Sequence, residues 1–387
     1  MMLFLFSAAR LAWRQIFFDK PRMLAAILGV TFACVLIFMQ LGFRDSLRIS
    51  TELAPQAMQG DLFVVHKQTE AMWRSTQFQK SILARALGHP DVASVHPVYI
   101  SLSFFKNMDT RLFRTLMVYG IDPDADLMGI PQVIAQKDII KLKDHVLFDR
   151  SSRPEFGSVE QQVRQGRVYT EINNYKVKIS GFFVLGTTFA VDGNVITSEE
   201  NFLRIVPNRT YETVDIGIIR LNNKSNLEKV RNELQNSLLK DVLVLTRQEF
   251  LELERNYWEQ TAPVGFIFGL GVIMGLIIGM VIVYQILFTN ISNNIVQFAT
   301  LKAMGYTQSY LLVAVFSLAA YLAVLGFMPG LLISLELYET AEKNIFIQFP
   351  MPVEKVVMVF SLILCMCFAA GVLAIRKLRY ANTAEMF

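Results

Sequence analysis

The residue types that most often carry catalysis or bind metals are scattered along this sequence. Its four histidines show neither H-x-H nor H-E-x-x-H spacing and stand at His66, His89, His96 and His145. A zinc site needs ligands at close, regular spacing, so we expect no metal. The sequence also has no G-x-x-x-x-G-K-[ST] phosphate loop and no G-x-S-x-G nucleophile motif. We therefore predict a chain that is not itself an enzyme and that holds no cofactor.

The most informative spacing lies in a short stretch within residues 289–309. Apolar side chains recur there at helical intervals, at Ile295, Phe298, Leu301 and Met304. Gly305 follows, and because glycine commonly ends a helix, the stretch predicts a short amphipathic helix. In a chain without an ATP-binding motif, such a helix is suited to docking a soluble partner. The alternative is a helix that only lies on the lipid surface.

The composition places this helix in a membrane protein. Of the residues, 53% are hydrophobic and 18% are charged, whereas soluble domains carry about 25% charge. The three cysteines lie inside apolar runs and give no disulfide framework or metal-ligand spacing; they are Cys34, Cys365 and Cys367. A helix of about 20 apolar residues spans a bilayer. Four segments qualify, at 23–43, 262–288, 310–338 and 353–375.

Charges beside these segments predict their orientation. The N-terminal segment 1–22 and the tail 376–387 are basic, whereas the short loop 339–352 is acidic. Cytoplasmic flanks are enriched in lysine and arginine. We therefore expect both termini and residues 289–309 in the cytoplasm, and the loop 339–352 outside.

The N-terminal segment itself has the pattern of an amphipathic helix. Arg10 and Arg14 lie one turn apart, with aromatic residues elsewhere around the helix, and Lys20-Pro21 follows. This favours a helix on the inner membrane surface. The alternative is a plain extension of the first span.

A long segment, residues 44–261, separates the first two spans. Residues 44–259 carry 27 basic and 27 acidic side chains, so the segment lacks the basic excess of a nucleic-acid-binding domain. Its ends, 44–60 and 247–261, have polar helical patterns and predict stalk helices that extend spans one and two outward.

Between the stalk helices, the strand and helix patterns predict a mixed α/β domain. Two strand–helix–strand units, at 61–121 and 213–246, resemble each other and predict one ferredoxin-like sheet. Residues 122–212 are rich in strand patterns and predict a β-rich subdomain inserted into that sheet. The expected fold class is therefore an α+β membrane protein, with four transmembrane helices and a large extracytoplasmic α/β domain between helices one and two.

The second span is rich in glycine. Two small-xxx-small patterns are formed by Gly265, Gly269, Gly271, Gly275 and Gly279. Such patterns let helix backbones approach closely. We expect packing within one bundle, with a dimer interface as the alternative.

Two stretches resemble the MacB/FtsX-type permeases of ABC transporters. FATLKAMGY (Phe298–Tyr306) resembles their coupling-helix signature, E-I-G-[IL]-x-[KR]-A-[LM]-G, and ARLAWRQIFFDKPRMLAAILGV (Ala9–Val30) resembles their opening. The order of one span, a large outer domain and three spans is also similar. The nearest match is the DevC subgroup, the permeases of heterocyst glycolipid exporters. Gln297 stands where many relatives have an acidic residue, so the resemblance implies a less ionic contact with the ATPase.

The resemblance implies a homodimeric permease in a bacterial inner membrane, bound to two copies of a separate ATPase that binds ATP and Mg. The coupling-helix residues would be Ile295, Gln297, Phe298, Leu301, Lys302, Met304, Gly305 and Tyr306. It also implies mechanotransmission, in which ATP-driven closure of the ATPase moves the outer domains while no substrate crosses the bundle. A periplasmic membrane-fusion adaptor and a TolC-like outer-membrane channel would complete the export system. The substrate would be a glycolipid or another amphiphile, and no residue marks its contacts.

Two other functions fit the same sequence. One is an FtsX-like or lipoprotein-release-like permease that regulates a periplasmic hydrolase or lipoprotein traffic. The other is a membrane-anchored sensor, which would need no ATPase.

Overall fold

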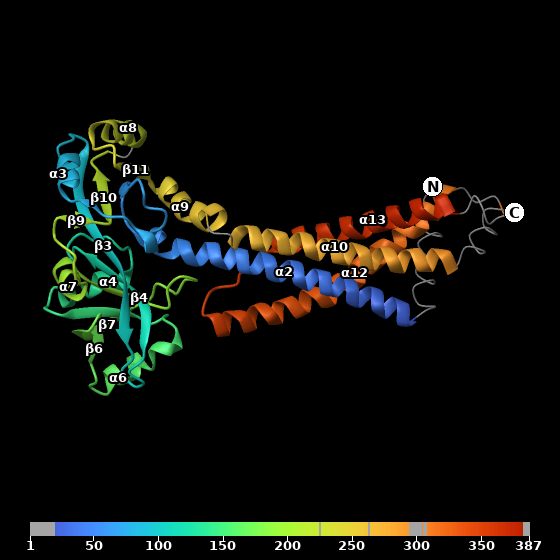
Figure 1. Ribbon diagram of the computed structural model, residues 1–387, viewed down its shortest axis with the longest axis horizontal. Coiled ribbons are helices and arrows are strands. Elements are labelled where there is room, and N and C mark those ends of the chain that lie inside the picture. The colour runs from blue at the N-terminus through green and yellow to red at the C-terminus, as the bar shows by residue number, and fades with distance from the viewer. Residues whose placement is uncertain (1–19, 224–225, 262–263, 294–303, 305–307, 382–387) are drawn as a thin grey trace. The chain divides into compact units, whose positions relative to one another are not determined.

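The computed structural model describes residues 20–223, 226–261, 264–293, 304 and 308–381. These residues form two compact units, and Figure 1 labels their elements. Of the described residues, the helical unit comprises 20–45, 264–293, 304, 308–342 and 349–381. The inserted domain comprises 46–223, 226–261 and 343–348.

Within the described residues, four helices are long and apolar enough to cross a membrane. They are α2 (Lys20–Ala57), α10 (Val264–Asn293), α12 (Gln308–Ile345) and α13 (Val353–Ala381). This confirms the expected four-helix fold. Beyond the expected span end at residue 43, α2 continues to Ala57 through most of the segment 44–60 that was expected as a stalk helix. α12 runs past its expected end at residue 338 to Ile345, because apolarity limits a membrane span but not a helix. Pro55 lies inside the last turns of α2 and does not end it at once. The expected surface helix falls almost wholly on residues 1–19, outside the described residues.

Glycines bring helices of the helical unit close together. A Cβ atom built on Gly279 of α10 would lie 2.7 Å from the Cβ of Ala33 in α2. A Cβ built on Gly330 of α12 would lie 2.8 Å from the Cβ of Cys34, also in α2. Real Cβ atoms do not approach so closely, so these helices pack almost backbone to backbone at the glycines.

The five glycines singled out in the sequence have different surroundings. Cβ atoms on Gly271, Gly275 and Gly279 would all meet side chains of α2. A Cβ on Gly269 would meet nothing within 4 Å. Gly265 lies in the first turn of α10.

Replacing Gly279 by leucine is therefore expected to destabilise the helical unit by about 1–3 kcal/mol, because the side chain would overpack the contact with Ala33. The same substitution at Gly269, which faces open space, is the matched control. Thermal unfolding of the purified full chain in detergent measures the difference. Equal losses of stability in the two variants would contradict this packing.

The inserted domain contains the expected ferredoxin-like arrangement. Its four strands are β1 (Leu62–His66), β3 (Val92–Lys106), β10 (Ile216–Leu221) and β11 (Val242–Thr246). They lie in the order β11-β1-β10-β3 and all their pairings are antiparallel. The helices α3 (Ser81–Leu87) and α8 (Leu227–Ser237) connect them, so the two strand–helix–strand units combine as predicted.

Residues 122–212 do not form a sheet of their own. Their strands continue the same sheet through β4 (Phe113–Ile121), which pairs with the second half of β3. The order continues with β8 (Asn194–Ser198), β5 (His145–Asp149), β7 (Tyr175–Phe183) and β6 (Tyr169–Ile172). The reason is the length of β3, whose 15 residues are more than β10 can pair. A separate two-stranded sheet joins β2 (Phe78–Gln79) to β9 (Thr213–Val214).

Shorter helices flank the sheet. They are η1 (Met72–Arg74), α4 (Pro131–Ala135), α5 (Lys137–Ile140), η2 (Pro154–Phe156), α6 (Val159–Arg164), α7 (Glu199–Ile205), α9 (Arg247–Asn256) and the π-helical turn η4 (Tyr257–Thr261).

Both faces of the sheet are covered. On one face, Leu62 and Val64 of β1 share a core with α3 and α8. On the other face, Phe63 of β1 stacks on Phe250 of α9 with ring centroids 4.6 Å apart. A strand buried on both sides reads as a continuous apolar run, which explains the sequence LFVVH of β1.

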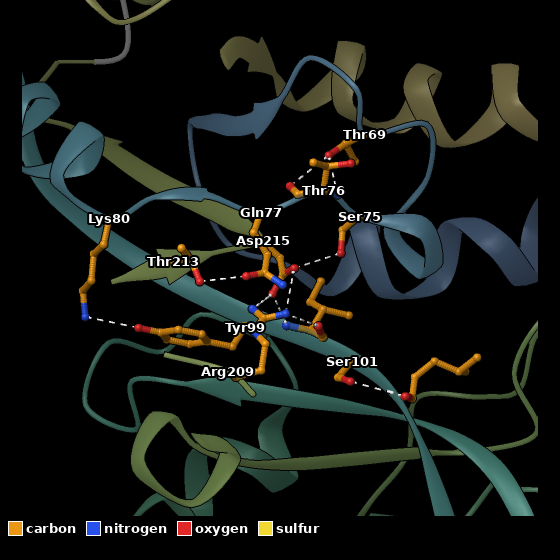
Figure 2. Close-up of polar contacts among 12 residues, drawn as sticks. Thr69, Ser75, Thr76, Gln77, Lys80, Tyr99, Ser101, Arg209, Thr213 and Asp215 are labelled. Carbon is orange, nitrogen blue, oxygen red and sulfur yellow. Dashed lines mark hydrogen bonds and ion pairs between the residues drawn. The ribbon is translucent and has the colours of Figure 1, made fainter. Parts of the chain in front are cut away.

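Strand β3 pairs with β10 up to Val98 and with β4 from Tyr99 onward. Beyond Val98, the edge of β3 that β10 no longer covers is hydrogen-bonded to a buried ion pair. The pairing with β10 ends at Val98, and the amide of Ile100 then donates to Asp215 Oδ2 over 2.8 Å. Arg209 donates to the Ile100 carbonyl over 3.4 Å and forms an ion pair with Asp215. Asp215 is 1% exposed and also accepts from the Ser75 hydroxyl, as Figure 2 shows. The amide and the carbonyl of Ile100 therefore both have hydrogen-bond partners, although no strand pairs with them on this edge of β3.

Candidate functional site: the connecting segments of the inserted domain

Three segments of the inserted domain join it along the chain to the apolar helices. They are the C-terminal part of α2 (46–57), the segment 247–261 that precedes α10, and residues 343–348. Residues 343–348, here called the loop 343–348, comprise the last three residues of α12 and the first three of the connection to α13. We call these the connecting segments. They are the covalent links between this domain and the apolar helices.

The segment 247–261 starts without any linker after β11. Thr246 caps α9 by accepting a hydrogen bond from the amide of Glu249 over 3.2 Å. The Glu249 carboxylate accepts in return from the amide of Thr246 over 2.8 Å. This reciprocal capping box fixes the direction of the helix at its first turn, so α9 and the sheet move together.

Two arginines tie α9 to the end of α2. Arg255 donates to the Glu52 carboxylate through Nε and Nη2, at 3.0 and 2.9 Å. Arg247 donates to the carbonyl oxygens of Gln56, over 3.2 Å, and of Met58. The last carbonyls of a helix have no hydrogen-bond donor within the helix, and Arg247 provides donors at the end of α2. The first two connecting segments are thus fastened to each other inside the inserted domain.

Glu254 is a buried carboxylate beside this junction. It is 4% exposed and accepts hydrogen bonds from the amide of Met72, over 2.8 Å, and from the indole of Trp258, over 3.1 Å. Among the described residues, no basic side chain pairs with it, since Arg255 is directed to Glu52. Burial raises the pKa of Glu254 to about 7, although its two hydrogen bonds lower it.

A small cavity adjoins Glu254. Its volume is about 30 Å³, which is room for a water molecule. Its walls include residues of α2, η1, β4, the loop 185–191 and η4, among them Thr51, Met72, Tyr119, Gly186, Asn194 and Trp258. Burial and the Glu254 charge raise the pKa of Tyr119. The inserted domain is therefore incompletely packed where its connecting segments approach one another.

Most of the expected ATPase-coupling residues fall outside the described part of the chain. These are Ile295, Gln297, Phe298, Leu301, Lys302, Gly305 and Tyr306. Met304 is described and is 65% exposed. The coupling helix stays a prediction.

Sequence reasoning missed Glu254 and the ion pair between Lys355 and Asp45. Glu254 lies four residues after Phe250, on the stripe that α9 buries, and that helical spacing was an available signal. Lys355 is 5% exposed, and its Nζ lies 2.9 Å from Asp45 in the helical unit. The sequence carries no signal for this ion pair, because a pairing between distant residues leaves no periodic pattern.

Comparison with known protein families finds a similarity in one part of the chain. Residues 269–383 match the family described as FtsX-like permease C-terminal. No curated protein matches the sequence. These residues include nearly all of α10 together with α12 and α13.

Two solved structures match about half of this chain at low sequence identity. The periplasmic region of MacB from Actinobacillus actinomycetemcomitans is 11% identical and has a TM-score of 0.36, covering 52% of this chain and 95% of that one. The extracellular domain of the noncanonic ABC-type transporter YknZ from Gram-positive bacteria is 10% identical and has a TM-score of 0.34, covering 48% and 99%. The family match covers less than half of the chain. The three C-terminal apolar helices thus lie in the part that is similar to the FtsX-like permease C-terminal family.

Proposed function

We propose that this protein is the membrane-spanning permease subunit of an ABC export system, driven by a separate cytosolic ATPase. The observation that carries the proposal is the match of residues 269–383 to the FtsX-like permease C-terminal family. The permease is a homodimer that binds two ATPase copies through residues 295–306. Both termini lie in the cytoplasm and the inserted domain lies outside the inner membrane.

The proposed mode of action is mechanotransmission. In support of it, α2 is one unbroken helix from Lys20 to Ala57, so displacement along its apolar part is carried into the inserted domain. The four apolar segments carry almost no charge, whereas ion and proton pathways through membranes use ionisable side chains. The inserted domain, moved in this way, acts on a periplasmic adaptor that leads to a TolC-like channel. The substrate is an amphiphile of the glycolipid class.

The coupling assignment has a direct test. Phe298→Asp combined with Lys302→Glu is expected to abolish co-purification of the partner ATPase and stimulation of its activity. The reason is that the double variant puts negative charge on the apolar stripe and reverses the charge of Lys302. Thermal unfolding of the variant checks that it still folds. Unchanged ATPase binding by a folded variant would refute the assignment.

The identity of the outer partner separates export from regulation. Cross-linking of the inserted domain in intact cells is expected to capture a membrane-fusion adaptor, and a deletion strain is expected to retain the exported lipid. Capture of a hydrolase instead would show that the permease regulates an outer enzyme.

A further inference from the structure

The loop between α12 and α13 is held inside the inserted domain by hydrogen bonds to its main chain. The Thr187 hydroxyl donates to the carbonyl of Phe346 over 2.7 Å. The Ser46 hydroxyl donates to the carbonyl of Gln348 over 2.6 Å. The next residue, Phe349, already belongs to the helical unit. Phe346 directly follows Ile345, the last residue of α12, whereas residues 349–352 separate Gln348 from the start of α13. On the α12 side, one peptide bond therefore joins the anchored loop to the helix.

The backbone of Phe346 has an unusual conformation. Its φ angle is 60°, in the left-handed region that a bulky residue rarely adopts. Residues persist there when the surrounding contacts determine the conformation. The hydrogen bond from Thr187 to the carbonyl of Phe346 is such a contact, and it marks the loop as clamped.

The two residues before Thr187 are held to the sheet by a buried carboxylate. Asp149, at the end of β5, is 0% exposed and accepts from the amides of Leu185, over 3.1 Å, and Gly186, over 3.0 Å. The Asn194 side chain of β8 donates to Asp149 over 2.8 Å and to the Gly186 carbonyl over 2.7 Å. Thr187 itself is 2% exposed. A rigid series of contacts thus runs from the loop 343–348 to strands β5 and β8.

The other two connecting segments contact the ferredoxin-like half of the sheet, and Leu53 of α2 also lines the small cavity beside Gly186 and Thr188. Arg255 and Arg247 fasten α9 to the end of α2, and Phe250 of α9 stacks on Phe63 of β1. Strand β1 belongs to the ferredoxin-like half, whereas β5 and β8 belong to the other half. The two halves meet along β3, at the partner change beside Ile100.

We propose that the loop 343–348 is a third mechanical connection, in which Thr187 couples α12 and α13 to strands β5 and β8. Displacement of α12 and α13 relative to α2 and α10 would then bend the sheet about the partner change of β3. Thr187 is a positioning residue in this scheme. The inference rests on the proposed function for the origin of the movement, but the clamp itself can be tested without it.

The clamp is tested by hydrogen exchange in the full-length permease without nucleotide. Thr187→Val keeps the shape of the side chain and removes the donor, so exchange in peptides covering 343–348 is expected to rise about fivefold. Thr187→Ser, which keeps the donor, should restore slow exchange. Thr213→Val removes a hydroxyl that donates to Gln77 over 2.7 Å elsewhere in the domain, and it should leave 343–348 unchanged. Unchanged exchange in Thr187→Val would overturn the clamp.

Transmission is tested in the complex of the permease with its ATPase, with and without ATP. In the unmodified protein, ATP is expected to change exchange both in 46–57 and in 145–198. In Thr187→Val, the change in 145–198 should be lost while the change in 46–57 remains. A change in 145–198 that survives in Thr187→Val overturns this inference and leaves the proposed function intact. Absence of any ATP-dependent change in the unmodified complex overturns the proposed function itself.

Discussion

Replacing Asp215 by asparagine is expected to destabilise the inserted domain by about 3–5 kcal/mol, which is the usual cost of breaking a buried ion pair. The variant leaves the Arg209 guanidinium, whose side chain is 9% exposed, without its counter-charge. It also weakens the acceptor that Ile100 and Ser75 share. Because Asp215 and Arg209 hydrogen-bond the edge of β3 that no strand covers, we expect the loss of protection to be largest around Ile100, where β3 stops pairing with β10.

Hydrogen exchange measures the loss of stability at the amides of β3 itself. Amides of β3 in Asp215→Asn are expected to exchange roughly 10² to 5 × 10³ times faster than in the unmodified protein, the ratio that this free energy implies. Adding Arg209→Met removes the unpaired charge and should recover part of the loss. Arg164→Gln is the matched surface control, since the Arg164 side chain is 76% exposed. Protection of β3 that does not differ between Asp215→Asn and Arg164→Gln would show that the pair does not hold the strand.

The second large effect is a dependence of stability on pH that comes from Glu254. The pKa of this carboxyl is about 7 in the folded chain, above its ordinary value of 4.5. Between these values the folded state binds more protons than the unfolded state, so stability falls as pH rises. The contribution is fully present below about pH 4.5 and is lost as pH rises through about 7. Its size is roughly 3 kcal/mol.

Glu254→Gln is expected to remove this dependence. Glutamine stays neutral, but its single side-chain oxygen can replace only one of the two carboxylate oxygens that accept from the amide of Met72 and the indole of Trp258. The lost hydrogen bond lowers stability at every pH and leaves the comparison between two pH values intact. Unfolding of the full chain in detergent at about pH 5 and pH 8 should show a loss roughly 3 kcal/mol larger in the unmodified protein than in the variant. Glu252→Gln, the same change two residues earlier on α9, is the control and should keep the dependence. If Glu254→Gln and the unmodified protein lose equal stability, Glu254 is not protonated in this range.

Much of the fold follows from local patterns in the sequence. Strands such as β1 and β10 were predictable because their apolar runs are bounded by turn residues. The two strand–helix–strand units then led to the ferredoxin-like order. The helix α7 was missed, although Ser198 caps it and Glu199 and Glu200 fill its first turn, which is a recognisable start signal.

The candidate site was much less predictable. The contacts between Thr187 and Phe346, and between Glu52 and Arg255, join residues 159 and 203 positions apart. Periodicity reports the face of one element and says nothing about which distant residue meets it. The continuation of the sheet beyond β3 was missed for the same reason, since strand pairing is decided by tertiary contacts.

The strand order of the inserted domain also determines when it can fold. Leu62 of β1 pairs with Ile219 of β10 and with Thr246 of β11. During synthesis, β1 therefore has no pairing strand until the ribosome has added more than 150 further residues. At the usual rate of synthesis this takes on the order of 10 s. During that time LFVVH is an apolar strand with two unpaired edges, and such segments aggregate. The strands from β4 to β8 lie closer together along the chain and can pair first. A cell that makes this protein therefore has to shield β1 until the end of the domain emerges.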